Sequence, residues 1–342
     1  MTEQSKQRAL VIGDGSWGTA MALLLCRNGI RTTLWSAFPE QSEVLASSHE
    51  NKRFLPGIPL PDLMEFSADP HSAAQDVDFA ISVVPTQYLR GVAERFEDAV
   101  PGNLPLATAT KGIEIETFKT PSQILQEVLG ERDVCVLSGP SHAEEVALGK
   151  PASIVAASKD MEVATLFQRA LSSDSFRVYT HNDPVGAELA AALKNVIAIA
   201  AGISDGLELG DNAKAALLTR GMIEMARFGR SHGAQSSTFF GLAGFGDLVT
   251  TCCSKHSRNR SVGESIGRGE TLEQVLERMN MVAEGVWTTK ALFGPETDLG
   301  ELEMPIAAQV HSVLFEGKDP SRAVRDLMSR ELSEEMEGLG EL

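Results

Sequence analysis

The chain has 342 residues, with 43% hydrophobic and 23% charged residues and a formal net charge of −17 from 30 basic and 47 acidic side chains. These values predict a soluble globular protein of two domains. The negative charge argues against a broad nucleic-acid or anionic-membrane surface, so an anionic substrate would need a local cluster of basic groups.

The cysteines and the hydropathy pattern predict a cytoplasmic protein. Cys26, Cys135, Cys252 and Cys253 match no metal-ligand spacing, so we expect no metal site and a reducing compartment. The polar start, MTEQSKQR, predicts no signal peptide. The longest apolar run, of about 15 residues, contains Lys194 and is too short to span a bilayer.

A glycine motif lies between a predicted strand (residues 9–12) and a predicted helix (residues 19–28). This order is typical of dinucleotide binding: Gly13 allows the tight turn, Gly15 the approach of the pyrophosphate, and Gly18 close helix–strand packing. The alternative is a glycine turn in another α/β fold. The next strand, residues 31–35, ends at Ser36-Ala37, which is neither acidic nor basic, so the choice between NAD(H) and NADP(H) stays open.

Further strands are predicted at residues 78–84, 104–110, 134–137, 152–157 and 175–179, with helices at 87–96 and 161–171, and loops around one or two short helices at 40–75. Polar groups follow two of these strands, at the sheet edge where parallel sheets bind ligands. Lys111 follows one strand, although it could be a solvated loop lysine. Gly139 and Ser141 follow the other, and we expect them to approach and hydrogen-bond a ligand. His142 is expected to pack rather than to act as an acid or base.

Residues 185–203 predict a helix that is buried nearly all round and has Lys194 at its middle. Burial lowers the pKa of an ammonium group, as a proton-transferring lysine requires. The alternatives are a lysine that reaches the surface or one in a structural ion pair.

The remaining chain reads as helical. We expect a helix from Asp211 or Asn212 to Phe228 that stops at Gly229, further helices at 272–279 and 305–315, and a solvated tail at 331–342. A glycine-rich loop at 241–246 ends in the carboxylate of Asp247. A basic segment at 255–260 follows, and its arginines suit phosphate oxygens unless it is only a solvated turn. The predicted fold is a Rossmann-type doubly wound α/β sheet domain (1–180) followed by an all-helical domain (181–342).

Several stretches together resemble the bacterial-type NAD(P)-dependent glycerol-3-phosphate dehydrogenases, over nearly the whole chain. They are GDGSWGTAMALLL (13–25), KGIE (111–114), SGPSHAEEVALGKP (138–151), the long block GAELAAALKNVIAIAAGISDGLELGDNAKAALLTRGMIEMARFG (186–229), TFFGLAGFGDLVTTC (238–252), SRNR (257–260), VAEGV (282–286) and EMPI (303–306).

The resemblance implies reversible reduction of dihydroxyacetone phosphate to sn-glycerol 3-phosphate with NAD(H) or NADP(H), supplying phospholipid synthesis, with Lys194 as general acid/base. It implies substrate binding by Lys111, Gly139, Ser141, Lys194, Asp247, Ser257, Arg258 and Asn259. It implies cofactor binding by Ser16, Trp17, Lys111, Ala143, Arg258, Val282 and Glu284, besides Gly13, Gly15 and Gly18. A homodimer is also expected.

Two departures from the family pattern stand out. Many members carry Arg or His near Ser36-Ala37, where a 2′-phosphate would sit, and His142 replaces the usual Phe. Two other functions stay open: a dehydrogenase for another small acid or alcohol, and a non-catalytic dinucleotide sensor.

Overall fold

The structure is a computed structural model that describes residues 7–279, 282–297, 299–300, 302–332, 334–336 and 339. The chain divides into two compact units. The first comprises the described residues up to Thr110 together with Pro121–Pro184, and the second comprises Lys111–Thr120 together with the described residues from Val185 onward. The domain limits expected from the sequence, at residues 180 and 181, stay a prediction, and the membership of Lys111–Thr120 in the second unit was not foreseen.

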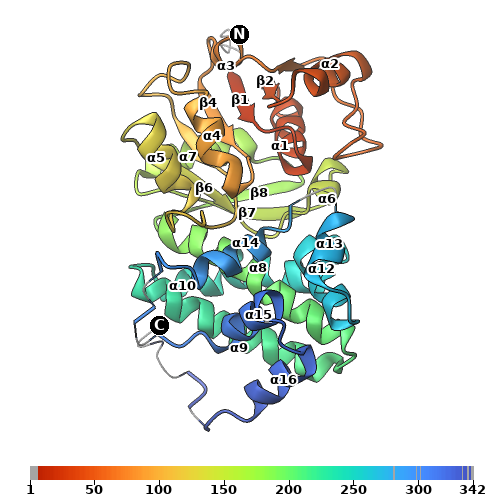
Figure 1. The fold of residues 1–342 in the computed structure, drawn as a ribbon. Coiled ribbons are helices and arrows are strands. Elements are labelled where there is room, and N and C mark those ends of the chain that lie inside the picture. Colours follow the sequence, from red (N-terminus) through yellow and green to blue (C-terminus); the bar gives the residue numbers. More distant parts are fainter. Residues whose placement is uncertain are drawn as a thin grey trace. The chain divides into compact units, whose positions relative to one another are not determined.

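An eight-stranded sheet forms the centre of the first unit (Figure 1). Its strands, in chain order, are β1 (Arg8–Ile12), β2 (Arg31–Trp35), β3 (Met64–Ser67), β4 (Phe79–Ser82), β5 (Leu106–Thr108), β6 (Val134–Ser138), β7 (Ala152–Ala157) and β8 (Phe176–His181). They lie in the order β3-β2-β1-β4-β5-β6-β7-β8, and every pair is parallel except β6 with β7. The first six strands have the order of a dinucleotide-binding fold, which confirms the predicted fold class.

Helices cover both faces of this sheet. They are α1 (Ser16–Arg27), α2 (Pro39–Ser48), α3 (Pro70–Ala74), α4 (Thr86–Glu94), α5 (Pro121–Leu129), α6 (Ala143–Ala147) and α7 (Met161–Leu171). Side chains alternate along β1: Ala9 and Val11 belong to one core cluster with residues of α1, α6 and α7, whereas Leu10 and Ile12 belong to another with residues of α3, α4 and α5. Burial on both faces explains why the strand is apolar throughout.

Four elements of the first unit differ from the prediction. The helix α1 begins at Ser16, inside the glycine motif, rather than at residue 19. The strand β3 lies in the stretch expected to hold loops around one or two short helices, and its mixed, half-buried sequence MEFS gives no clear pattern because it is an edge strand. The helices α5 and α6 were not predicted, and α6 is only five residues long.

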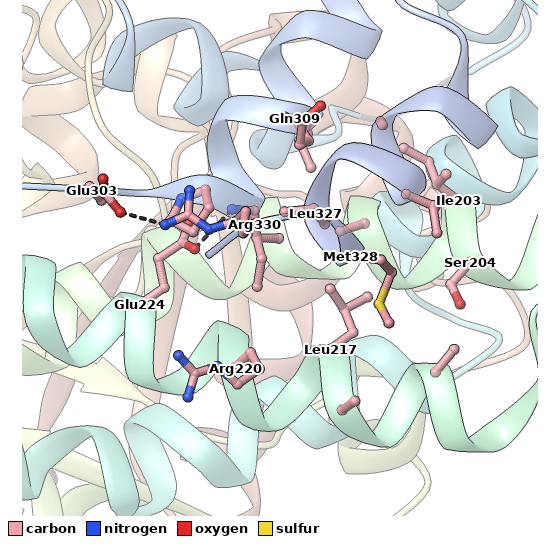
Figure 2. Close-up of a pocket in the computed structure, with 18 of the residues that line it drawn as sticks. Ile203, Ser204, Leu217, Arg220, Glu224, Glu303, Gln309, Leu327, Met328 and Arg330 are labelled. Atoms are coloured by element: carbon pink, nitrogen blue, oxygen red, sulfur yellow. Dashed lines mark hydrogen bonds and ion pairs between the residues drawn. The ribbon is translucent and has the colours of Figure 1, made fainter. Parts of the chain in front are cut away.

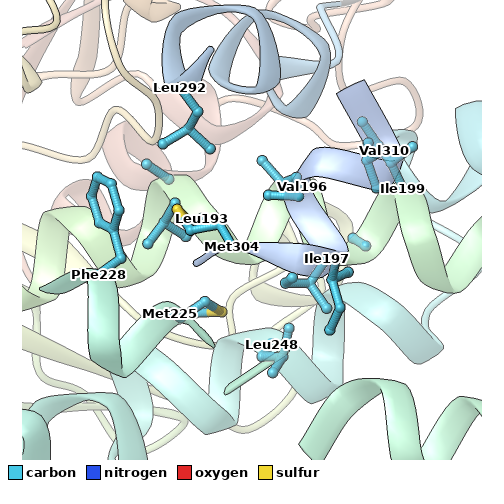
Figure 3. Packing of buried hydrophobic residues seen from close by; sticks show 14 of the residues in the cluster. Leu193, Val196, Ile197, Ile199, Met225, Phe228, Leu248, Leu292, Met304 and Val310 are labelled. Atoms are coloured by element: carbon cyan, nitrogen blue, oxygen red, sulfur yellow. The ribbon is translucent and has the colours of Figure 1, made fainter. Parts of the chain in front are cut away.

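The second unit is helical. Its elements are α8 (Pro184–Gly206), α9 (Gly210–Ser231), α10 (Ser236–Phe240), the π-helical turn η1 (Leu242–Gly246), α11 (Asp247–Cys253), α12 (Arg258–Gly267), α13 (Leu272–Glu277), α14 (Glu284–Leu292), α15 (Pro305–Phe315) and α16 (Pro320–Met328). Figure 3 shows side chains of α8, such as Leu193 and Ile197, packed among those of neighbouring helices, including Met225 and Phe228 of α9.

The helix α8 is long and apolar enough, by length and composition, to cross a membrane, and 94% of its most apolar window is buried inside the protein. Its 23 residues extend beyond the apolar run that the sequence suggested, because Pro184 starts the helix early and Gly206 ends it late. This burial matches the prediction of a core helix that is enclosed nearly all round.

Glycines allow α8 and α12 to touch through their backbones. A Cβ on Gly202 would lie 2.0 Å from the carbonyl oxygen of Arg260, and a Cβ on Gly263 would lie 2.0 Å from that of Ile199. Gly206 and Gly267 repeat the arrangement one turn further along. Any side chain at these positions would push α12 away from α8.

Three expectations for the second unit were wrong. The helix α9 starts at Gly210 and continues through Gly229, where a Cβ would lie 2.1 Å from Phe239 Cζ, so this glycine serves packing rather than helix termination. The glycine-rich loop is the π-helical turn η1. The tail is not wholly solvated, because Leu339 is 1% exposed and its carbonyl accepts a hydrogen bond from Arg230. Residues 333, 337, 338 and 340–342 of that tail lie outside the described residues.

Candidate active site

Lys194, Asp247 and Lys111 form a buried ionic cluster within the second unit. Lys194 Nζ donates to Asp247 Oδ1 at 2.7 Å, and Lys111 Nζ donates to Asp247 Oδ2 at 2.8 Å. The ammonium of Lys194 also donates to Thr251 Oγ1 at 2.6 Å. Lys194 is 4% exposed and Asp247 2% exposed, whereas the side chain of Lys111 is 19% exposed, so one carboxylate pairs with one buried and one partly buried cation. The surplus positive charge suits an anionic ligand or transition state.

Burial sets the proton affinity of this cluster. It lowers the pKa of Lys194 from 10.5 to about 8; the charge of Asp247 opposes this shift, and that of Lys111 adds to it. For Asp247, burial alone would raise the pKa, but the charges and hydrogen bonds of the two lysines outweigh it and hold the pKa below its usual value. The carboxylate therefore stays charged, while Lys194 can lose its proton near neutral pH.

The turn before α11 explains how Asp247 reaches the lysines. The π-helical turn η1 packs tightly on α10, since a Cβ on Gly244 would lie 2.0 Å from the carbonyl oxygen of Phe239. Asp247 is the first residue of α11, and Thr251 follows one helical turn later on the same face. Glycine in η1 is thus needed for the close packing on α10 that places the start of α11, and with it Asp247, in the interior of the unit.

Two asparagines connect the lysine helix to its neighbours. Asn259 Nδ2 donates to Asn195 Oδ1 at 2.9 Å, and Asn259 Oδ1 accepts from the backbone N–H of Gly285 at 2.9 Å. A Cβ on Gly285 would lie 2.5 Å from the carbonyl oxygen of Asn195. The starts of α12 and α14 are therefore fixed against α8 beside Lys194.

The basic segment separates into an exposed part and a structural part. Ser257 caps α12 by accepting from the N–H of Arg260 at 3.2 Å, and Arg258 follows as an exposed residue in the first turn. Arg260 instead pairs with Asp205, Nε to Oδ2 at 2.6 Å, and with Glu264. Of the two arginines that suit phosphate, Arg258 is the more exposed, and Arg260 supports the packing of α12 on α8.

The glycine motif of the first unit has the shape of a dinucleotide cradle. Gly13 has φ +114°, and a Cβ there would lie 2.9 Å from the carbonyl oxygen of Val83. A Cβ on Gly18 would lie 1.8 Å from the carbonyl oxygen of Gly13, whereas one on Gly15 would meet nothing within 4 Å. Gly15 thus leaves open space at the start of α1, where no side chain caps the helix. These features fit a pyrophosphate bound at the N-terminus of α1, beside Ser16 and Trp17.

The segment after β6 contains the other predicted residues of the first unit. Gly139 has φ +148°, and a Cβ there would lie 2.8 Å from Ile154 Cα, so its glycine is needed for the close approach of β7. Ser141 Oγ donates to the carbonyl oxygen of Gly139 at 2.9 Å. His142 occupies the N-cap position of α6, and Ala143 is its first, buried residue.

Two family models match the chain: the N-terminal part of NAD-dependent glycerol-3-phosphate dehydrogenase over residues 8–164, and its C-terminal part over residues 183–325. A glycerol-3-phosphate dehydrogenase [NAD(P)+] of Bacillus cytotoxicus is 48% identical over 335 residues, which cover 97% of this chain and 98% of the relative. The chain belongs to this family of dehydrogenases. It is therefore an NAD(P)-dependent oxidoreductase, as the resemblance predicted.

Other relatives agree with this membership of the glycerol-3-phosphate dehydrogenases. The relative from Chlorobium phaeobacteroides, with the same name, is 47% identical over 329 residues, covering 95% of this chain and 98% of its own. The crystal structure of a glycerol-3-phosphate dehydrogenase from Coxiella burnetii superposes with a TM-score of 0.91 at 36% identity, covering 95% of this chain and 99% of that one.

The predicted site residues of this dehydrogenase divide between the two units. The structure brings Lys111, Lys194 and Asp247 into direct contact and places Ser257, Arg258 and Asn259 at the start of α12. In the same unit, Val282 is half-buried, and Glu284 is the first residue of α14. Sequence reasoning missed Thr251 and Asn195. Thr251 could have been found from its spacing of four residues after Asp247, and Asn195 from its position next to Lys194.

A cavity of 1420 Å³ lies elsewhere in the second unit of the dehydrogenase, and none of the predicted site residues lines it (Figure 2). Glu224 lies on its wall and accepts hydrogen bonds from the N–H groups of Ile306 and Ala307, each at 2.9 Å. Burial raises the pKa of Glu224 to about 7. Arg330 pairs with Glu303, so the charged groups here hold the chain after α16. Among the residues that the structure describes, no cluster of His, Cys, Asp or Glu could hold a metal ion.

Proposed function

We propose that this dehydrogenase catalyses the reversible reduction of dihydroxyacetone phosphate to sn-glycerol 3-phosphate, with Lys194 as general acid in reduction and general base in oxidation. The observation that carries the proposal is the buried contact of Lys194 Nζ with Asp247 Oδ1 at 2.7 Å. It supports the role because a lysine with a pKa of about 8 can both donate and accept a proton near neutral pH.

The residues of the cluster have complementary roles in this proposal. The nicotinamide, when bound, supplies or accepts the hydride. Negative charge then develops on the carbonyl oxygen, and the Lys194 ammonium stabilises this charge and transfers its proton to the oxygen. Asp247 orients Lys194 and keeps Lys111 beside it. Thr251 accepts a further hydrogen bond from Lys194 Nζ and restricts the ammonium to one position.

We also propose which residues bind the phosphorylated substrate and the dinucleotide. Arg258 is exposed at the start of α12, where its guanidinium and the helix N-terminus both favour a phosphate. Ser257 and Asn259 flank it, and Lys111, Gly139 and Ser141 complete the proposed substrate set. The glycines of the motif, Ser16, Trp17, Ala143, Val282 and Glu284 are proposed to hold the dinucleotide, together with Lys111 and Arg258.

The wider setting is also part of the proposal. A cytoplasmic enzyme with this activity would supply sn-glycerol 3-phosphate for phospholipid synthesis. We expect a homodimer that binds neither nucleic acid nor membranes stably, which light scattering after gel filtration and binding to anionic vesicles would test.

The decisive experiment measures oxidation of NADH and NADPH by dihydroxyacetone phosphate, in the wild type and in Lys194→Ala. Loss of the general acid should lower kcat by roughly 10²–10⁴-fold, while thermal unfolding stays cooperative. Lys159→Ala, at an exposed lysine of the first unit, is the matched control and should keep full activity.

The same assay separates the other functions. Turnover of unphosphorylated hydroxy acids without turnover of the ketone phosphate would identify a different dehydrogenase. Tight dinucleotide binding without any NADH oxidation would identify a sensor. Near-normal kcat in Lys194→Ala would remove Lys194 from the mechanism.

A further inference from the structure

The strand β2 ends without the acidic side chain that commonly selects NAD(H), but a carboxylate reaches the same place from the neighbouring turn. Ser36 directly follows β2, and its Oγ donates to Asp14 Oδ2 at 3.0 Å. Asp14 lies between the first two glycines of the motif, after β1. A single hydrogen bond therefore places its carboxylate at the carboxyl end of β2, where an acidic residue would hold the adenosine ribose.

The backbone around Asp14 is held firmly. Asn51 Nδ2 donates to the carbonyl oxygen of Asp14 at 2.7 Å, and Thr19 Oγ1 donates to the same oxygen at 3.2 Å. Ser36 is fully buried, and Asp14 is 7% exposed. The carboxylate is thus preorganised rather than free to turn towards solvent.

One oxygen of this carboxylate has no side-chain partner in the part of the chain that the structure describes. Among the described residues, Ser36 is the one side chain with a hydrogen bond to the carboxylate, through Oδ2, so Oδ1 is the oxygen that we assign to a ligand. Burial raises the pKa of Asp14, and the hydrogen bond from Ser36 and the charge of Arg53 act in the opposite sense, towards the charged form. A carboxylate oxygen here can accept a hydrogen bond from a ribose hydroxyl but repels a phosphate.

Two arginines near the end of β2 have other contacts. Arg95 donates to the carbonyl oxygen of Ala37 at 3.3 Å, and its guanidinium carbon lies 4.6 Å from the centre of the Trp35 ring. The guanidinium carbon of Arg53 lies 4.8 Å from the centre of the Phe54 ring. Both side chains are exposed, so their charges are screened by solvent more strongly than that of the buried carboxylate.

We propose that Asp14 accepts a hydrogen bond from the adenosine 2′-hydroxyl of NAD(H) and excludes the 2′-phosphate of NADP(H), so that this enzyme prefers NADH. The inference rests on the dinucleotide-binding function of the glycine motif and assigns its specificity to a residue inside the motif. In many dinucleotide-binding folds a side chain at the end of β2 binds the adenosine ribose. Here Asp14, in the turn after β1, would bind it instead, and Ser36 is the residue that positions Asp14.

Direct binding tests this proposal without turnover. Dissociation constants of NADH and NADPH are measured by titration calorimetry on the full-length wild type, Asp14→Asn, Asp14→Ala and the control Asp62→Asn, which alters an exposed carboxylate of the first unit. The wild type should bind NADH at least about tenfold more tightly than NADPH. Asp14→Asn keeps the shape and removes the charge, so NADPH affinity should rise by roughly 10–100-fold.

The other two variants test whether Asp14 also contributes to NADH binding. Asp14→Ala should also weaken NADH binding by about tenfold, because the ribose loses its acceptor, and Asp62→Asn should change neither constant. The proposal is overturned if the wild type binds NADPH as tightly as NADH, if the ratio is unchanged in Asp14→Asn, or if neither dinucleotide binds. Tight and selective NADH binding without oxidation by dihydroxyacetone phosphate would contradict the proposed reaction and leave the role of Asp14 standing.

Discussion

The hydrogen bonds of Lys194 leave one of its donors for a ligand. Lys194 is the one basic residue of α8, and two of its three N–H donors are used by Asp247 and Thr251. One donor therefore remains for a ligand oxygen. Because Asp247 pairs with Lys111 through its other oxygen, removal of either lysine would change the charge felt by the other.

The lowered pKa of Lys194 predicts opposite pH profiles for the two reaction directions. Ketone reduction needs the protonated lysine, so kcat/KM should fall tenfold per pH unit well above pH 8. Alcohol oxidation needs the neutral lysine, so kcat/KM should rise up to the same pH and then level off. Steady-state rates at substrate concentrations below KM, taken on both sides of pH 8, measure this.

Lys194→Arg provides the matched control for the pH profiles. A guanidinium does not lose its proton in this range, so any residual activity should lack the inflection. An inflection that persists unchanged in this variant would assign the titration to another group.

For the lysine cluster, the sequence predicted which residues take part but not which of them are in contact. Lys194 is visible as a cation in an apolar helix, and Asp247 as a carboxylate after a glycine run. Their pairing depends on how η1 and α11 pack against α8, which is long-range information that local patterns do not contain. The role of Thr251 depends on the same packing.

Helix packing through glycine positions the functional end of α12. Gly202 and Gly206 on α8 face Gly263 and Gly267 on α12, so the two backbones come within van der Waals contact. Arg258 and Asn259 lie at the start of α12, in the turns before this contact. The spacing of four residues is visible in the sequence, but a single sequence does not reveal which two helices pair.

Gly263→Ala should therefore damage both stability and activity. The added Cβ would lie 2.0 Å from the carbonyl oxygen of Ile199, so α12 must shift. We expect a loss of about 1–3 kcal/mol in the free energy of unfolding and a raised KM for the phosphorylated substrate. Urea unfolding and steady-state kinetics measure the two effects.

A glycine in open space serves as the control for Gly263→Ala. A Cβ on Gly91, in α4, would meet nothing within 4 Å, so Gly91→Ala should stabilise the protein by about 0.5–1 kcal/mol and leave KM unchanged. Equal effects of the two substitutions would show that the close packing of α8 and α12 is not important.

On the scale of the whole molecule, the second unit is built from two separate parts of the chain. Ile113 is fully buried in its core cluster, and Phe118 packs against that cluster with its ring 6.3 Å from that of Phe228. Thr120 Oγ1 donates to Glu188 Oε2 at 2.8 Å. A boundary drawn from the alternation of strands and helices alone misses this segment, because the segment is too short to form a helix or strand of its own.

A fragment that starts at residue 185 should therefore be less stable than one that also carries residues 111–120. The contact between Thr120 and Glu188 allows a short Gly/Ser linker to join the two parts. The free energy of unfolding of the joined fragment should exceed that of the fragment without residues 111–120 by at least about 2 kcal/mol. This is the usual cost of removing one large buried side chain. Circular dichroism during urea titration measures the difference.

The control for the fragments carries Ile113→Ala and Phe118→Ala in the joined segment, and it should recover little of the added stability. If the fragment without residues 111–120 proves as stable as the joined one, the segment is an accessory of the helical unit rather than part of its core.

The split origin of the second unit has a consequence for biosynthesis. Lys111 leaves the ribosome well before Asp247, the carboxylate that holds it. At about 5–20 residues per second, the 136 residues that separate them take roughly 7–27 s to synthesise. Until the helices of the second unit have been synthesised, Ile113 and Phe118 lack the core residues that bury them. Translation speed through the helices that follow thus sets how long a nascent chain presents this apolar segment to chaperones.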